Sequence, residues 1–186
     1  MRQFVFVTLA LASLSAFAED TTWIAEARRV AAIVPPKLLA VLSEQIAKVG
    51  PEGAVPVCRD LAPQMARAAS EETGWNIRRV SLKNRNPKAV PDAWERAALE
   101  DFDWRVAAGE PPTALDKAEI VTLGDRKEYR YIKALPVQEF CLQCHGTPDR
   151  ISAGVREKLH TLYPADKAVG YRDGEIRGAI TIRKPI

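Results

Sequence analysis

The chain has 186 residues, of which 47% are hydrophobic and 27% are charged, and its formal net charge is +3. This ordinary globular composition excludes general disorder and a fibrous repeat, and the length suits one domain with a real hydrophobic core. The charge is small and mixed in sign, so the composition does not indicate a nucleic-acid partner.

The N-terminus has the pattern of a secretory signal peptide. Arg2 supplies a positive start, an apolar run follows at residues 4–12, and Ala16-Phe17-Ala18 is a small-x-small cleavage site. The apolar run is short for a bilayer crossing, which disfavours a membrane anchor, and we expect no membrane span after cleavage. We therefore predict a signal peptide at 1–18 and a mature, periplasmic domain at 19–186.

Apolar residues at helical spacing predict three helices in the first half of the chain. They cover residues 23–34, 37–49 and 54–73, and the second is either a separate helix or a kinked extension of the first. Proline and glycine provide the stop signals. These signals are Pro35-Pro36, Gly50-Pro51 and Gly74.

The sequence after residue 74 favours strands. Residues 75–82 are rich in strand-forming residues, although the alternation slips between Ile77 and Val80, which predicts a β-bulge. A helix is expected at 92–107 with Asp92 as its N-cap. A short helix is also expected near residues 150–160.

Two hairpin-like units complete the pattern. In the first, residues 119–123 and 128–135 flank the turn Gly124-Asp125. In the second, a turn at Asp173-Gly174 precedes a strand at 176–183. Its expected faces are Ile176, Ile180 and Ile182 on one side and Arg177, Thr181 and Arg183 on the other. Helices packed on an antiparallel sheet make the predicted fold class α+β.

The most informative motif is Cys141-Leu142-Gln143-Cys144-His145, which is the C-x-x-C-H signature of c-type haem attachment. Two thiols on one helical turn reach the two vinyl groups of one haem edge, and the adjacent His145 becomes the proximal iron ligand. Haem of this type is attached outside the cytoplasm, so the signal peptide agrees with it. We expect one covalently attached haem c.

Two other kinds of site, a redox-active disulfide and a zinc site, can also contain two cysteines at this spacing. A redox-active disulfide does not need the histidine and usually accompanies a thioredoxin-like βαβ pattern, which this sequence lacks. A zinc site requires a fourth ligand at recognisable spacing. Cys58 could supply one, but not in a local pattern.

The second axial position of the iron has several candidates by residue type. They are Cys58, Met65 and His160, with lysine or water as weaker options. Cys58 and Met65 also suit the apolar face of one helix, where both residue types are ordinary core residues. Spacing alone leaves this choice open, although metal coordination would explain an unpaired thiol at Cys58 in an exported protein.

Further motifs accompany the haem signature. Downstream lie Tyr163-Pro164, Asp166-Lys167-Ala168, Gly170-Tyr171 and Gly178-Ala179. Upstream lie Val57-Cys58-Arg59, Ala62-Pro63, residues 78–82 (RRVSL), residues 84–87 (NRNP) and Trp94-Glu95. Together, over residues 25–186, they resemble a family of exported bacterial proteins that carry a single covalent c-type haem on a PAS-like fold.

The resemblance implies a PAS-like α+β fold and an iron ligated by His145 and Cys58. A thiolate ligand stabilises Fe(III), so a low potential is expected. We expect a redox or diatomic-gas sensor module rather than an enzyme, because a six-coordinate iron leaves no open position for peroxide. The alternative is a small periplasmic electron carrier. Either role requires a partner that the sequence does not name.

Haem propionates need cationic or hydrogen-bonding partners when they are partly buried. The residue types that suit this role lie in and around the predicted strands. The candidates are Arg78, Arg79, Arg85, Arg130 and Tyr131.

Overall fold

The computed structural model describes residues 13–186, so most of the predicted signal peptide lies outside the described residues. The helices and strands follow in chain order. They are α1 (Ser13–Ala31), α2 (Val34–Thr73), β1 (Asn76–Val80), α3 (Ala93–Ala107), β2 (Asp116–Leu123), β3 (Arg126–Pro136), α4 (Leu142–His145), α5 (Ala153–Leu162) and β4 (Ile176–Pro185), with short 3-10 turns at Pro87–Ala89, Pro112–Ala114 and Glu139–Cys141.

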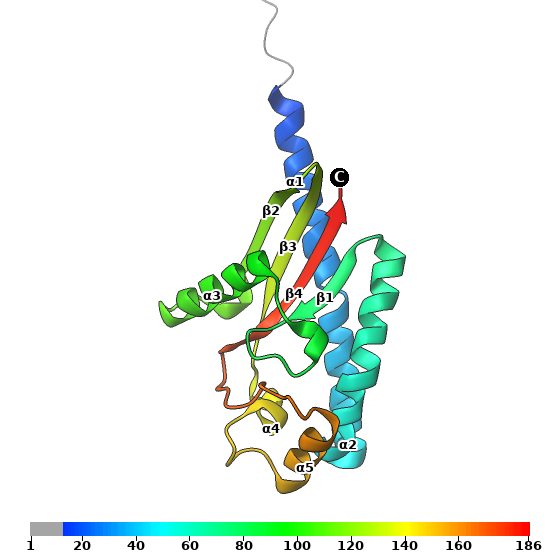
Figure 1. Ribbon diagram of the computed structural model, residues 1–186, viewed down its shortest axis with the longest axis vertical. Coiled ribbons are helices and arrows are strands. Elements are labelled where there is room, and N and C mark those ends of the chain that lie inside the picture. The colour runs from blue at the N-terminus through cyan, green and yellow to red at the C-terminus, as the bar shows by residue number, and fades with distance from the viewer. Residues whose placement is uncertain (1–12) are drawn as a thin grey trace, which may run out of the picture.

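One four-stranded antiparallel sheet, in the order β1-β4-β3-β2, organises the molecule (Figure 1). Helices α1 and α2 pack on one face, where Trp23 and Val30 meet Tyr131 and Ile182. Helix α3 packs on the other face through Leu99 and Phe102, beside strand residues such as Val80 and Ile132. Helices on both faces of an antiparallel sheet confirm the predicted α+β class.

Strand β1 is regular, and the bulge predicted between Ile77 and Val80 is wrong. The pairing with β4 runs without interruption from Ile77↔Ile182 to Val80↔Ala179. The apparent slip arises because the sheet is buried on both faces. Ile77 packs toward α1 and α2, whereas Val80 packs toward α3.

A bulge does occur, on β4. Leu135 pairs with Gly178 but Pro136 pairs with Ile176, so Arg177 is an extra residue in the ladder. Ile176 therefore packs on the α3 side, and Arg177 lies on the same side as Ile180. The prediction that Ile176 and Ile180 share one face, with Arg177 opposite, is wrong for this reason.

The prediction of a second hairpin is wrong as well, because no strand precedes the turn at Asp173-Gly174 in the described residues. Residues 163–175 form a loop. The Gly174 amide donates to the Val137 carbonyl, and the Val137 amide donates to the Glu175 carbonyl. The turn therefore delivers the chain into β4, which pairs with β3 and β1.

One predicted stop signal is displaced: the first helix ends at Ala31, and Pro35 and Pro36 begin α2, where proline fits the first turn. Three other local predictions are confirmed. Asp92 caps α3 in a reciprocal capping box with Glu95, and the turn at Gly124-Asp125 joins β2 to β3. Gly74, at φ 72°, ends α2. In each case the sequence signal depends on neighbouring residues alone.

Helix α2 consists of two limbs that fold back on each other (Figure 1). Gly50 separates them, with a φ of 74° and a ψ of 172° that no helix contains. By length and composition alone, the helical stretch 22–73 is apolar enough to cross a membrane, so the expectation of no span after cleavage stays a prediction. A turn at 32–33 and the break at Gly50 leave a first limb about 24 Å long, below the roughly 30 Å of a bilayer core.

Candidate functional site

A pocket between the two limbs of α2 and the end of the sheet brings together the predicted site residues. Cys141, Cys144, His145 and Cys58 all line it. Most of the remaining wall is aliphatic, with one aromatic ring. These side chains are Val34, Leu38, Leu39, Leu42, Ile46, Ala54, Val55, Ala62, Ala66, Leu135, Phe140 and Ile180.

The cysteine motif forms a single compact turn. Cys141 ends the 3-10 turn at 139–141, and α4 carries Cys144 and His145. Gly146 closes the turn by donating its amide to the Leu142 carbonyl. A Cβ atom on Gly146 would lie 2.5 Å from that carbonyl oxygen, so only glycine fits here.

His145 is held in one tautomer. Its Nδ1 lies 2.7 Å from the Ala168 carbonyl oxygen, which can only accept, so Nδ1 carries the proton. The lone pair is therefore on Nε2, and Nε of Arg177 lies 3.4 Å from it. Burial, together with the charges of Arg177 and Arg85, lowers the pKa of His145 well below its usual value. A neutral imidazole whose Nε2 carries no proton is the form that binds a metal, and here Nε2 has only the long contact from Arg177.

Cys58 reaches the pocket from the second limb of α2 and is half-buried. Burial raises the pKa of its thiol, and the charges of Arg79, Arg85 and Arg177 oppose this rise. The two alternatives lie elsewhere. Met65 packs against the core between α1, α2 and the sheet, and His160 is exposed on α5.

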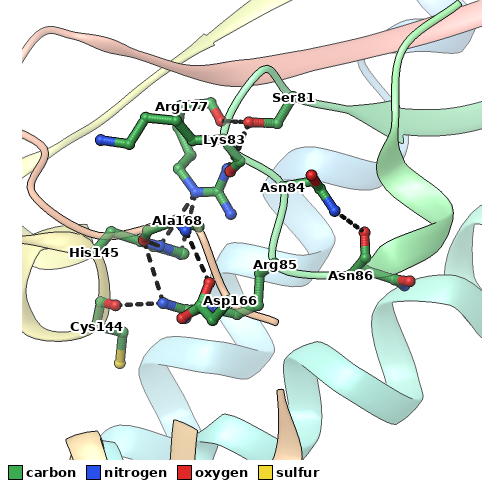
Figure 2. A network of polar contacts seen from close by, with 10 residues as sticks. All are labelled: Ser81, Lys83, Asn84, Arg85, Asn86, Cys144, His145, Asp166, Ala168 and Arg177. Carbon is green, nitrogen blue, oxygen red and sulfur yellow. Dashed lines mark hydrogen bonds and ion pairs between the residues drawn. The ribbon is translucent and has the colours of Figure 1, made fainter. Parts of the chain in front are cut away.

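Arg85 connects the loop after β1 to the cysteine motif (Figure 2). Its Nε donates to Asp166 at 3.0 Å, and its Nη2 donates to the carbonyl of Cys144 at 2.6 Å and to that of Ala168 at 3.3 Å. Asp166 also accepts the Ala168 amide at 2.8 Å. The guanidinium therefore has a fixed position and a neutralising carboxylate.

Two more arginines line the pocket, and sequence reasoning identified only Arg79. It missed Arg177, which the bulge turns toward His145. The available signal was Gly178, since an isolated glycine in a strand often marks a bulge. The other predicted propionate partners make their contacts elsewhere. Arg78 bonds to the Val90 carbonyl, Arg130 to Asp92, and the Tyr131 hydroxyl to Asp116.

The residues present fit the predicted haem. Two thiols on one turn and a neutral imidazole are the groups that a c-type haem requires, and the apolar wall suits its macrocycle. Cys58 adds a further thiol in the same pocket. Although Cys58, Cys141, Cys144 and His145 line one pocket, no three histidine, cysteine or acidic side chains of the described residues lie close enough together to hold a metal ion by themselves.

Comparisons with known proteins agree with this description. A family model described as Tll0287-like matches residues 12–185. The chain is similar to the solved structure titled "Crystal structure of the cyanobacterial heme-protein Tll0287", with 24% identity and a TM-score of 0.60. That match covers 94% of this chain and 97% of the other. None of the curated proteins matches. The shared fold confirms the PAS-like prediction.

Proposed function

The chain belongs to the Tll0287-like family, and on this premise we propose that it is an exported haem c protein that acts as a redox or diatomic-gas sensor module. Cys141 and Cys144 attach one haem, and His145 and Cys58 are its axial ligands. The observation that carries the proposal is the shared pocket. It brings Cys58 from α2 together with a motif on α4.

Each residue has a distinct task in this proposal. The thiols of Cys141 and Cys144 form thioethers at one haem edge, and the hydrogen bond from Nδ1 to Ala168 directs Nε2 of His145 toward the metal. The haem supplies an iron that changes oxidation state and can exchange a ligand. Cys58 provides the exchangeable thiol. Loss of its contact would free the second limb of α2 to shift, which is the proposed signal.

Covalent attachment is tested by export of the protein together with a c-haem maturation system, followed by a haem-stained denaturing gel and mass measurement. The wild-type band should stain and carry the mass of one haem. A variant with both Cys141→Ala and Cys144→Ala should be colourless, whereas the control Cys58→Ser should still stain. An unstained wild-type protein of unmodified mass would refute haem attachment.

The role of Cys58 is tested by optical and EPR spectra of Cys58→Ser in both oxidation states. Loss of the wild-type low-spin ferric signal is the expected result. An unchanged low-spin spectrum would remove Cys58 from the iron. In the wild type, a sensor should change coordination upon reduction or CO addition. An iron that stays six-coordinate and low-spin under both conditions would favour the electron carrier.

A further inference from the structure

We propose that Arg79 and Arg177 hold the two carboxylates of the haem, as a pair of cations on the sheet side of the pocket. This inference rests on the proposed haem function and deepens it. It follows from the charges that line the pocket, from their existing partners, and from the backbone that positions Arg177.

The pocket has an excess of positive charge. Three guanidinium groups line it, from Arg79, Arg85 and Arg177, and no aspartate or glutamate is among its lining residues. Asp166 neutralises Arg85, whose other contacts are backbone carbonyls. Two guanidinium groups without a carboxylate partner therefore remain at the pocket. Arg177 is buried, where an unpaired charge is costly, and Arg79 is exposed along the pocket wall.

Arg79 extends from β1 on the α1 and α2 side of the sheet. Its side chain has solvent-accessible surface and lines the pocket, where Cys58 and Cys141 are close enough to interact with its charge. Within residues 22–186, no side chain or carbonyl accepts a hydrogen bond from it or pairs with it. A guanidinium carries five N–H donors, so Arg79 retains its full capacity to bind an anion.

Arg177 makes contacts that leave its charge uncompensated (Figure 2). Its Nη1 donates to the Ser81 hydroxyl at 3.0 Å and to the Lys83 carbonyl at 3.3 Å, and its Nε faces the His145 ring. All of these acceptors are neutral. Its Nη2 has no acceptor among the described residues, so this nitrogen can still donate.

The two guanidinium groups also repel each other. Arg177 is buried, Arg79 lies close enough for its charge to act on Arg177, and no hydrogen bond or ion pair among the described residues joins either guanidinium to a carboxylate. A ligand with two carboxylates would offset the repulsion between the two guanidinium groups and the burial of the Arg177 charge, because hydrogen bonds between charged partners are among the strongest in proteins. A haem has two such carboxylates, and the number of uncompensated arginines is the same.

The test uses the variant that lacks both attachment cysteines (Cys141→Ala with Cys144→Ala), titrated with ferric haem and with its dimethyl ester. This variant should bind the diacid about tenfold or more tightly than the diester. Adding Arg79→Gln or Arg177→Gln should reduce that preference several-fold. The matched control is Arg183→Gln, which removes a charge from the same strand as Arg177 outside the pocket and should leave the preference unchanged.

The outcomes separate the two proposals. Equal binding of diacid and diester would overturn the carboxylate assignment and leave haem binding intact. A colourless wild-type band on the haem-stained gel would overturn haem attachment itself. Resonance Raman spectra of the covalent holoprotein provide a second measurement. The carboxylate bending bands should shift in Arg79→Gln and Arg177→Gln but not in Arg183→Gln, and unchanged bands in both pocket variants would also overturn the assignment.

Discussion

The Nε atom of Arg85 lies 3.0 Å from Oδ2 of Asp166, in an ion pair whose side chains are only 7% and 11% exposed. The pair joins the loop after β1 to the loop after α5. Through the carbonyls of Cys144 and Ala168 it also supports the segments that hold His145. A single buried ion pair therefore fixes two backbone segments around the site.

Asp166→Asn should strongly destabilise the protein, because it leaves the buried guanidinium of Arg85 without an anion. A loss of about 3–5 kcal/mol is expected for a broken buried pair. The control is Asp60→Asn, which breaks an exposed pair with Arg59 and should cost less than about 1 kcal/mol. Urea unfolding compares the two variants. Equal losses would show that the Arg85 pair has no special structural role.

Gly178→Ala should disrupt the end of β4. Its φ of 148° is unfavourable for alanine, and a Cβ atom would lie 2.3 Å from the Val80 carbonyl oxygen. We expect a loss of about 2–4 kcal/mol. Gly174→Ala is the matched control, since Gly174 has a φ of 82° but no atom within 4 Å of the added carbon. It should cost about 1 kcal/mol. Thermal unfolding that ranks the two equally would contradict the close approach of the strands.

Asp116→Asn should remove a pH-dependent part of the stability. Burial alone would raise the pKa of Asp116, but hydrogen bonds from Arg28 and Tyr131 outweigh it and lower this pKa below the usual 3.8. A carboxyl with a depressed folded-state pKa stabilises the fold above its unfolded pKa. This contribution is lost as the pH falls through the folded-state value.

The wild type should therefore exceed Asp116→Asn by about 1–2 kcal/mol at pH 7. Denaturant unfolding between pH 7 and pH 2.5 measures the difference. The gap should stay constant down to about pH 4 and shrink below it. A gap that is independent of pH across this range would show that the charge of Asp116 contributes nothing.

Leu42→Ala tests whether the pocket wall contacts a bound group. Leu42 lines the pocket and is only half-buried in the protein alone, so its truncation should cost less than about 1.5 kcal/mol without haem. With haem attached the cost should rise, because the same side chain would then pack fully. Thermal unfolding of Leu42→Ala in the wild type and in the variant without attachment cysteines compares the two costs. Equal costs would contradict this packing.

Local signals allowed much of the fold to be predicted. The Asp92 capping box and the Gly124-Asp125 turn depend on adjacent residues, and both lie where the sequence placed them. The turn of Cys141, Cys144 and His145 is local in the same sense. The choice of Cys58 as a partner of this turn rested on the resemblance and on its being an unpaired thiol in an exported protein, because no periodicity connects α2 to α4.

The errors arose where tertiary context decides the outcome. The slip between Ile77 and Val80 suggested a bulge because period-two reasoning assumes one buried face, whereas this sheet is covered on both. The true bulge at Arg177 depends on how β4 pairs with β3, which sequence alternation does not reveal. As a result, Arg177 was missed as a pocket residue.

The division of the pocket between α2 and the sheet has a consequence for redesign. Most of the aliphatic side chains come from the two limbs of α2, while Arg79 and Arg177 come from strands β1 and β4. An engineer could thus exchange Leu38 or Ile46 to admit a bulkier porphyrin rim without touching the arginines. Conversely, replacing Arg79 by an acidic residue would reverse the charge at this position and favour macrocycles that carry amines, while the aliphatic side chains from α2 stay the same.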